Sequence, residues 1–137
     1  MAHTFLIRRV RFSATHRYRR PDWSEERNRR AFGSAVDAHG HDFEVEVVVG
    51  GPVDPETGFL VDLAALDEVL RAHVVDPLDQ QDLTTAVPEF RSGGKLPTTE
   101  NLAFWIWEEL ESRIPGTAVL DRVRVFESGD LGSEYRG

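Results

Sequence analysis

The chain has 137 residues, of which 40% are hydrophobic and 29% charged, an ordinary composition for one globular domain spanning residues 1–137. It contains no cysteine, which excludes disulfides, cysteine-based zinc sites and cysteine nucleophiles. The net charge is −8, and no apolar run is long enough for a signal peptide or a membrane span, so we expect a cytoplasmic protein.

The basic residues gather near the N-terminus. Nine of the sixteen lysines and arginines fall in residues 1–30, which carry a charge of +6, whereas the remaining residues carry −14. Nucleic acid is a poor candidate partner, because the overall charge has the wrong sign and no basic groove interleaved with aromatics is evident. The basic segment is either a solvated face or a local site for an anion such as phosphate, which arginine binds with paired hydrogen bonds.

The first predicted strand covers residues 5–16. Its alternation places His16 on the same apolar face as Phe12, near the end of the strand. The polar loop that follows, residues 17–37, contains a turn or short helix beginning at Ser24. A loop of this length is often functional.

The second predicted strand covers residues 41–49 and is preceded by a histidine pair, His39 and His41. Alternate side chains of a strand share a face, so both imidazoles point the same way as Phe43, toward an apolar interior. A single histidine there is most often a hydrogen-bonded core residue, but two of them together with His16 predict a zinc site. Three histidines with an open fourth position are the pattern of a catalytic zinc.

Two amphipathic helices are predicted in the second half of the chain. An N-cap at Asp62 and apolar residues at helical spacing predict a first helix that ends before Pro77. After a polar connection, Pro97 and the threonines that follow it predict the start of a second helix, which Gly116 closes. The tryptophans of this second helix predict a core or subunit contact.

The last predicted strand, residues 122–127, places Glu127 on the same face as Val123 and Val125. A carboxylate among apolar contacts normally has a partner, which makes Glu127 a candidate site residue. The alternative is that Glu127 lies at the wet end of the strand.

Short motifs extend over nearly the whole chain, from about residue 5 to its end. They are Phe12-Ser13-Ala14-Thr15-His16, His39-Gly40-His41, Asp54-Pro55-Glu56-Thr57-Gly58, Pro77-Leu78-Asp79, Pro97-Thr98-Thr99-Glu100-Asn101 and Glu127. In order and spacing the set resembles the 6-pyruvoyltetrahydropterin synthase family, which includes the 6-carboxytetrahydropterin synthases. The resemblance implies the α+β tunnelling fold, a four-stranded antiparallel sheet with two helices on one face. Copies of such a chain join into a barrel in a trimer, and two trimers stack into a homohexamer.

The resemblance also implies roles for the candidate site residues. It assigns zinc binding to His16, His39 and His41, in agreement with the parity argument. It assigns binding of the pterin ring to Glu127, whose two oxygens can accept hydrogen bonds from the guanidine-like edge of that ring. It assigns the lining of the same pocket, across a subunit boundary, to Thr98, Thr99 and Glu100. In the family, zinc acidifies the side chain of dihydroneopterin triphosphate while a protein base moves the proton and triphosphate leaves.

Two positions depart from the pattern of the family. Ala35 stands where the family has its proton-abstracting cysteine, and Gln80 stands where it has the histidine of an Asp-His pair. Asp37 and Asp79 are therefore the candidate catalytic residues, with zinc-bound hydroxide as another possible base.

Three functions remain open from the sequence. The first is a zinc lyase that acts on a dihydropterin, by triphosphate elimination or by side-chain cleavage with a carboxylate base. The second is a diverged family member with another substrate, and the third is a non-catalytic pterin- or metal-binding protein. We favour the first, because the ligands, the anchor and the fold determinants are all retained.

Overall fold

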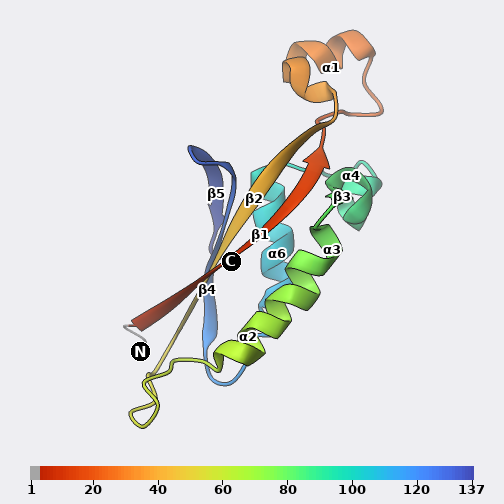
Figure 1. Cartoon of the computed structure of the whole chain (residues 1–137). Coiled ribbons are helices and arrows are strands. Elements are labelled where there is room, and N and C mark those ends of the chain that lie inside the picture. The colour runs from red at the N-terminus through yellow and green to blue at the C-terminus, as the bar shows by residue number, and fades with distance from the viewer. Residues whose placement is uncertain (1–3) are drawn as a thin grey trace.

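The computed structural model describes residues 4–137, which form one sheet and several helices (Figure 1). The elements in chain order are β1 (Thr4–His16), α1 (Glu25–Phe32), a 3-10 turn (Gly33–Val36), β2 (His39–Gly51), α2 (Leu63–Leu70), a π turn (Arg71–Val75), α3 (Asp76–Leu78), β3 (Gln81–Asp82), α4 (Leu83–Ala86), α5 (Pro88–Arg91), α6 (Thr99–Leu110), β4 (Val119–Ser128) and β5 (Leu131–Tyr135). This mixture confirms the α+β fold class. Within residues 4–137, no helix is long and apolar enough to cross a membrane.

The sheet has the strand order β3-β1-β2-β4-β5. Four of its strands are antiparallel, as expected, and β1 pairs with β2 along its full length up to the pair His16 and His39. The fifth strand, β3, corrects the expected count: it adds two residues parallel to β1. Gln80 directs the chain to that edge, because it adopts a left-handed φ of 61° and its N–H donates to the Ser13 carbonyl.

One face of the sheet carries the hydrophobic core. The helical segment 63–78 and α6 lie against this face, so that two long helices cover it (Figure 1). Phe12 of β1 stacks on Phe43 of β2 there, with ring centroids 5.1 Å apart. The fully buried core side chains include Val45, Val47, Leu66, Leu70, Leu78, Leu83, Leu102, Ile106 and Leu110. The period-2 pattern of β1 and β2 therefore predicts correctly which residues face inward.

The opposite face of the sheet carries ion pairs. The Glu46 carboxylate accepts from Arg9 Nε at 2.8 Å and from Arg124 Nη1 at 2.9 Å, which joins three neighbouring strands. Burial alone would raise the pKa of Glu46, but the two guanidinium groups hold it below its ordinary value. Arg11 pairs with Glu44 on the same face. This face is therefore polar where the other is apolar.

The first long helix does not end before Pro77, as the sequence pattern suggested. It continues from α2 through the π turn into α3 and ends at Leu78. The N–H of Asp76 donates to the carbonyl of Arg71, five residues earlier, so the turn before the proline is wider than an α-helical turn. In a regular helix the ring of Pro77 would clash with the carbonyl four residues back. The wider turn makes room for the ring, so the helix continues past Pro77 to Leu78.

The second long helix, α6, begins where the sequence predicted and ends earlier. Thr98 is its N-cap, and the Thr98 hydroxyl accepts from the Asn101 N–H at 3.1 Å. The helix ends at Leu110 rather than at Gly116, which adopts a φ of 68° in the turn toward β4. The polar connection before it contains two short helices, α4 and α5, that the sequence pattern did not indicate.

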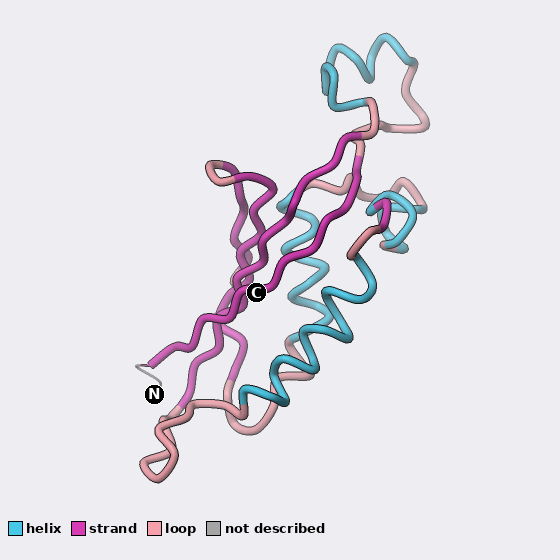
Figure 2. The backbone as a smooth tube through the Cα atoms, viewed as in Figure 1, coloured by secondary structure: helices cyan, strands magenta, loops and turns pink. Residues whose placement is uncertain are grey.

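The segment between β1 and β2 extends beyond the ends of both strands, with α1 at its tip (Figure 2). Ser24 caps α1 by accepting from the Arg27 N–H at 3.1 Å. Trp23 stacks on Phe32 with ring centroids 5.8 Å apart, and the Arg27 guanidinium lies 3.9 Å from the Trp23 ring. The excursion is thus packed against itself, and it places the end of β1 and the start of β2 at its base.

Candidate metal centre

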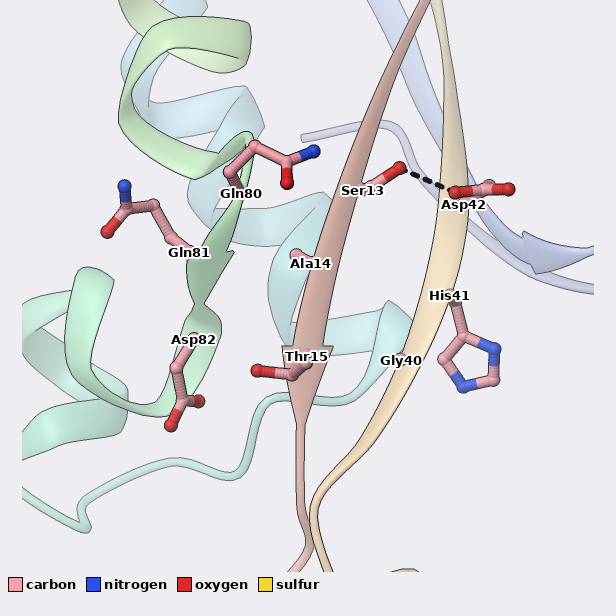
Figure 3. Close-up of a pocket in the computed structure, with 9 residues that line it drawn as sticks. All are labelled: Ser13, Ala14, Thr15, Gly40, His41, Asp42, Gln80, Gln81 and Asp82. Carbon is pink, nitrogen blue, oxygen red and sulfur yellow. Dashed lines mark hydrogen bonds between the residues drawn. The ribbon is translucent and has the colours of Figure 1, made fainter.

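The three predicted histidines meet at one end of the sheet. His16 ends β1, His39 begins β2, and the two are direct partners in the strand register. His41 lies two residues further along β2 on the same face, and Figure 3 shows it pointing away from Gln80. One nitrogen from each imidazole lies within 4.8 Å of the others, a spacing that could hold a metal ion.

Backbone carbonyls orient two of these imidazoles. Nδ1 of His16 lies 2.8 Å from the Pro97 carbonyl oxygen, and Nδ1 of His39 lies 2.8 Å from the Asp37 carbonyl oxygen. A carbonyl accepts only from N–H, so each Nδ1 is the protonated nitrogen and each Nε2 keeps its lone pair for a ligand. The carbonyl of Pro97 thus fixes the tautomer that metal binding needs.

Two further observations indicate that the three imidazoles suit a metal ion. Nε2 of His16 and Nε2 of His41 are buried, and neither makes a hydrogen bond of acceptable geometry within residues 4–137, although a carboxylate oxygen of Glu127 lies 2.8 Å from the second. Burial, together with a smaller effect of the neighbouring histidines, lowers the pKa of His16 to about 4 against the opposing effect of the Pro97 carbonyl. His16 is therefore neutral at pH 7, the state in which imidazole binds a metal.

Glu127, near the end of β4, reaches the same cluster. Its Oε2 lies 2.8 Å from Nε2 of His41 and 3.7 Å from Nε2 of His16. The side chain is 11% exposed, on the same face as the buried Val123 and Val125. The alternative of a solvent-exposed strand end is therefore wrong, and a carboxylate lies beside the imidazoles.

The N-terminus of α6 forms the next wall. Thr99 is buried, and its hydroxyl lies 3.0 Å from Oε1 of Glu100 and 2.6 Å from the hydroxyl of Ser133 in β5. Thr98 uses its hydroxyl as the helix cap. These residues directly follow Pro97, the partner of His16, so the structure brings the predicted pocket segment next to the histidines.

The two candidate catalytic carboxylates lie outside the cluster in the single chain. The Asp37 side chain is 69% exposed and faces Arg29 at 3.4 Å, and only its backbone carbonyl contacts His39. Oδ1 of Asp79 accepts from the Ser13 N–H at 2.9 Å. Ser13 precedes His16 by three strand residues, which corresponds to roughly 10 Å along β1.

Gln80 and its neighbours line a cavity of about 420 Å³ that extends over β3, β1 and β2 and includes His41 in its lining (Figure 3). The Ser13 hydroxyl donates to Oδ1 of Asp42 at 2.5 Å on this side of the sheet. Gln80 is the residue with the left-handed φ, and such strained backbone is common at functional sites. Ala35 lies beside Tyr18, whose N–H donates to the Ala35 carbonyl at 2.8 Å.

Tyr18 is a site residue that the sequence reasoning missed. Its ring centroid lies 5.0 Å from that of His16 and 6.0 Å from that of His39. Burial raises the pKa of Tyr18 to about 12, and the charges of Glu127 and Glu100 add to the effect. Its hydroxyl therefore stays protonated and can donate a hydrogen bond at neutral pH. The only signal in the sequence was its place two residues after His16.

Comparison with known proteins gives one consistent family. The family model described as 6-pyruvoyl tetrahydropterin synthase matches residues 6–137. The human protein named 6-pyruvoyl tetrahydrobiopterin synthase is 37% identical over 134 residues, covering 96% of this chain and 90% of the relative. A Pyrococcus furiosus protein named dihydroneopterin monophosphate aldolase is 32% identical, covering 94% of each chain. The structure of Caenorhabditis elegans 6-pyruvoyl tetrahydropterin synthase superposes with a TM-score of 0.88 at 31% identity, covering 98% of this chain and 95% of the other.

Proposed function

The chain belongs to the 6-pyruvoyl tetrahydropterin synthase family, whose members are lyases of tetrahydropterin biosynthesis, and we propose that it is a zinc-dependent lyase acting on a dihydroneopterin-type substrate. One observation carries the zinc assignment: three imidazoles converge, and the Nε2 atom of His16 is buried without a hydrogen-bond partner among the described residues. Zinc favours imidazole nitrogen, and three histidines leave a position for water or substrate.

Each residue of the cluster has a defined task in this proposal. When bound, zinc would act as a Lewis acid toward a hydroxyl of the substrate side chain. His16, His39 and His41 would hold the metal ion through the imidazole nitrogens that converge at the site. Glu127 lies beside them with two carboxylate oxygens that can accept paired N–H bonds from the pterin ring. Tyr18 lies against His16 and keeps its hydroxyl protonated, so it can donate a hydrogen bond at the site.

The proton-transfer group is the open part of the proposal. Ala35 has no ionisable group and Gln80 has an amide without a useful pKa, so the elimination of triphosphate lacks its usual base. A second candidate reaction is therefore cleavage of the substrate side chain, the type of chemistry that the name of the Pyrococcus relative indicates for that protein. Asp37 and Asp79 remain the proposed acid and base residues. Either would have to reach the histidines by rearrangement or from another copy of the chain.

Product identification separates these reactions. The purified, zinc-loaded protein is incubated with dihydroneopterin triphosphate and, separately, with dihydroneopterin, and the products are identified by mass. A pyruvoyl product with released triphosphate indicates elimination, and a shortened pterin side chain with a two-carbon fragment indicates cleavage. Turnover of neither substrate would overturn the lyase proposal.

Metal analysis tests the zinc assignment without reference to activity. His39→Ala should lose most of the bound zinc, because it removes one of three ligands. His73→Ala is the matched control, since His73 lies on the π turn and contacts Glu109 at 3.6 Å. A full zinc equivalent in His39→Ala would remove His39 from the metal site.

Restoring the missing proton-transfer groups tests whether their absence makes triphosphate elimination slow. Ala35→Cys with Gln80→His should raise triphosphate elimination by at least about tenfold, a lower bound set below the roughly 10²–10⁴-fold that one positioned acid or base contributes. If the unaltered protein already eliminates triphosphate at a rate that the double variant does not improve, another base acts. Asp37→Asn would then be the next variant.

A further inference from the structure

A second cavity, of about 270 Å³, lies behind the metal centre. One wall is the chain that leaves β1, from Arg17 to Pro21, and the other is the connection from Thr84 to Pro97. The two walls come together near Gly93 and Pro21, where a Cβ added at Gly93 would lie in van der Waals contact with the proline ring, at 3.5 Å. We refer to this cavity as the basic pocket.

The charge of the basic pocket is opposite to that of the protein. Its lining contains four basic side chains, Arg17, Arg19, Arg91 and Lys95, and no carboxylate, although the chain as a whole has a net charge of −8. Like charges gathered in one concave site repel each other and attract an anion. The distribution therefore favours a negatively charged occupant.

Three of the four cations have no carboxylate partner among residues 4–137, and two of these three also lack an aromatic contact. Arg19 is paired with Glu25, and the Lys95 ammonium rests 4.1 Å from the ring of Phe104. Arg17 and Arg91, by contrast, form no ion pair with any carboxylate of residues 4–137. Arg91 uses Nε to donate to the Thr85 carbonyl at 3.1 Å, which anchors the base of its guanidinium group.

A polar atom without a partner adds an independent indication. The Thr84 hydroxyl oxygen is buried and has no hydrogen-bond partner among the described residues, and Thr84 belongs to the lining of the basic pocket. A buried hydroxyl that can both donate and accept is normally satisfied by a neighbour, by water or by a ligand. The pocket thus combines cations and a hydroxyl, the groups that bind phosphoryl oxygens.

We propose that the basic pocket binds a phosphoryl group, held by Arg17 and Arg91 from opposite walls. The planar guanidinium matches phosphate oxygens with two parallel N–H bonds. The pocket and the metal centre share a boundary, because Arg17 directly follows His16 and Pro97 belongs to both. The phosphoryl group is therefore either the phosphorylated tail of a substrate bound at the metal or a free polyphosphate. Identifying the group as the tail of a substrate rests on the proposed function, whereas the proposal that the basic pocket binds a phosphoryl group does not.

The test is a calorimetric titration of the zinc-loaded protein with inorganic triphosphate. Arg91→Gln should weaken binding by about tenfold or more, the loss expected for a charge-assisted hydrogen bond. Arg113→Gln is the matched control: Arg113 is also exposed and also bonds a backbone carbonyl, that of Glu109 at 2.6 Å, but lies outside the pocket lining. The affinity of the Arg113→Gln variant for triphosphate should stay within about twofold of that of the unaltered protein. Zinc content is measured after each titration, because triphosphate chelates the metal.

The source of the phosphoryl group is decided by a second measurement. If Arg91→Gln raises KM for dihydroneopterin triphosphate and leaves dihydroneopterin binding unchanged, the pocket holds the tail of the substrate. If Arg91→Gln weakens triphosphate binding and leaves KM unchanged, the pocket holds a free polyphosphate. Arg17→Gln should reproduce the loss from the other wall. Absence of triphosphate binding, or binding that neither variant weakens, overturns the proposal. Because the titration needs no turnover, an inactive lyase would not mimic that result.

Discussion

His16 links the strand pattern to the chemistry of the site. Its ring is fully buried, its Nδ1 contacts a carbonyl 81 residues away in sequence, and its Nε2 faces the other imidazoles. Strand parity predicted its direction, because alternation of side chains is a local property. Neither the Pro97 carbonyl nor Tyr18 could be predicted in the same way. Their positions depend on how α6 and the segment between β1 and β2 pack against the sheet, and no local sequence pattern encodes this packing.

Burial of His16 should make the metal-free protein sensitive to acid. Its pKa is about 4 in the folded chain against 6.5 in the unfolded chain, so between these values only the unfolded state binds the proton. The stabilisation is complete above pH 6.5 and is lost as the pH falls toward 4, at up to about 1.4 kcal/mol per pH unit and about 3 kcal/mol in total. Denaturant unfolding at several pH values measures it.

Carboxylates also titrate near pH 4, so the effect is read as a difference between variants. His16→Gln should flatten the slope between pH 6.5 and 4, whereas His73→Gln, at a partly exposed histidine outside the cluster, should retain it. An unchanged slope in His16→Gln would show that His16 is not the group being protonated.

Glu127→Gln should weaken binding of a pterin while leaving the bound zinc in place. The amide keeps the shape of the carboxylate but presents a donor where the ring already donates, so binding should weaken by roughly 1.5–3 kcal/mol. Glu44→Gln is the control, because Glu44 pairs with Arg11 on the opposite face of the sheet. Unchanged pterin affinity by calorimetry in Glu127→Gln would refute the anchoring role, and loss of zinc would make Glu127 a metal ligand instead.

Among the helices and strands, α6 links the stability of the fold to the candidate site, because its N-terminus directly follows Pro97, the partner of His16. Thr98→Ala removes the cap that satisfies the Asn101 N–H and should lower the free energy of unfolding by about 1 kcal/mol. Thr117→Ala, at an exposed threonine outside any helix, should change it by less than about 0.5 kcal/mol. Equal losses in the two variants, measured by denaturant unfolding, would mean that the cap contributes nothing.

Elements with strong periodicity were predictable, and those made by tertiary contact were not. The strands β1 and β2 and the start of α6 follow from alternation and capping. Two-residue β3 has no periodicity to detect, and it exists because Gln80 turns the chain against Ser13. The helix also passes Pro77, because a π turn accommodates the ring that a local reading treats as a helix end.

The whole molecule leaves sheet edges open. The short β3 pairs only with Ala14 and Thr15, so the rest of the outer edge of β1 has no strand beside it within the described residues, and Phe5 and Ile7 are about half exposed there. At the other side of the sheet the edge strand is β5, which follows the last strand that the sequence pattern predicted. Unpaired edges with apolar side chains favour pairing with another chain.

We therefore predict a homohexamer of two barrel-forming trimers. Light scattering at micromolar concentration should give about six times the 15.5 kDa mass of the chain. Ile7→Lys should reduce the assembled fraction, because a charge at a strand edge opposes pairing. A strictly monomeric protein would remove both the barrel and any contribution of Asp79 from a neighbouring copy to the histidine cluster.

The pairing of His16 with His39 has a consequence for the order of folding. The two imidazoles meet only when the long hairpin of β1 and β2 has closed in the correct register, because a slip of one residue turns a strand's side chains to the opposite face. Closing this hairpin requires the intervening 22 residues, from Arg17 to Ala38, to be looped out first. In a refolding experiment, zinc uptake should therefore lag behind the appearance of sheet structure and mark the moment at which the register becomes final.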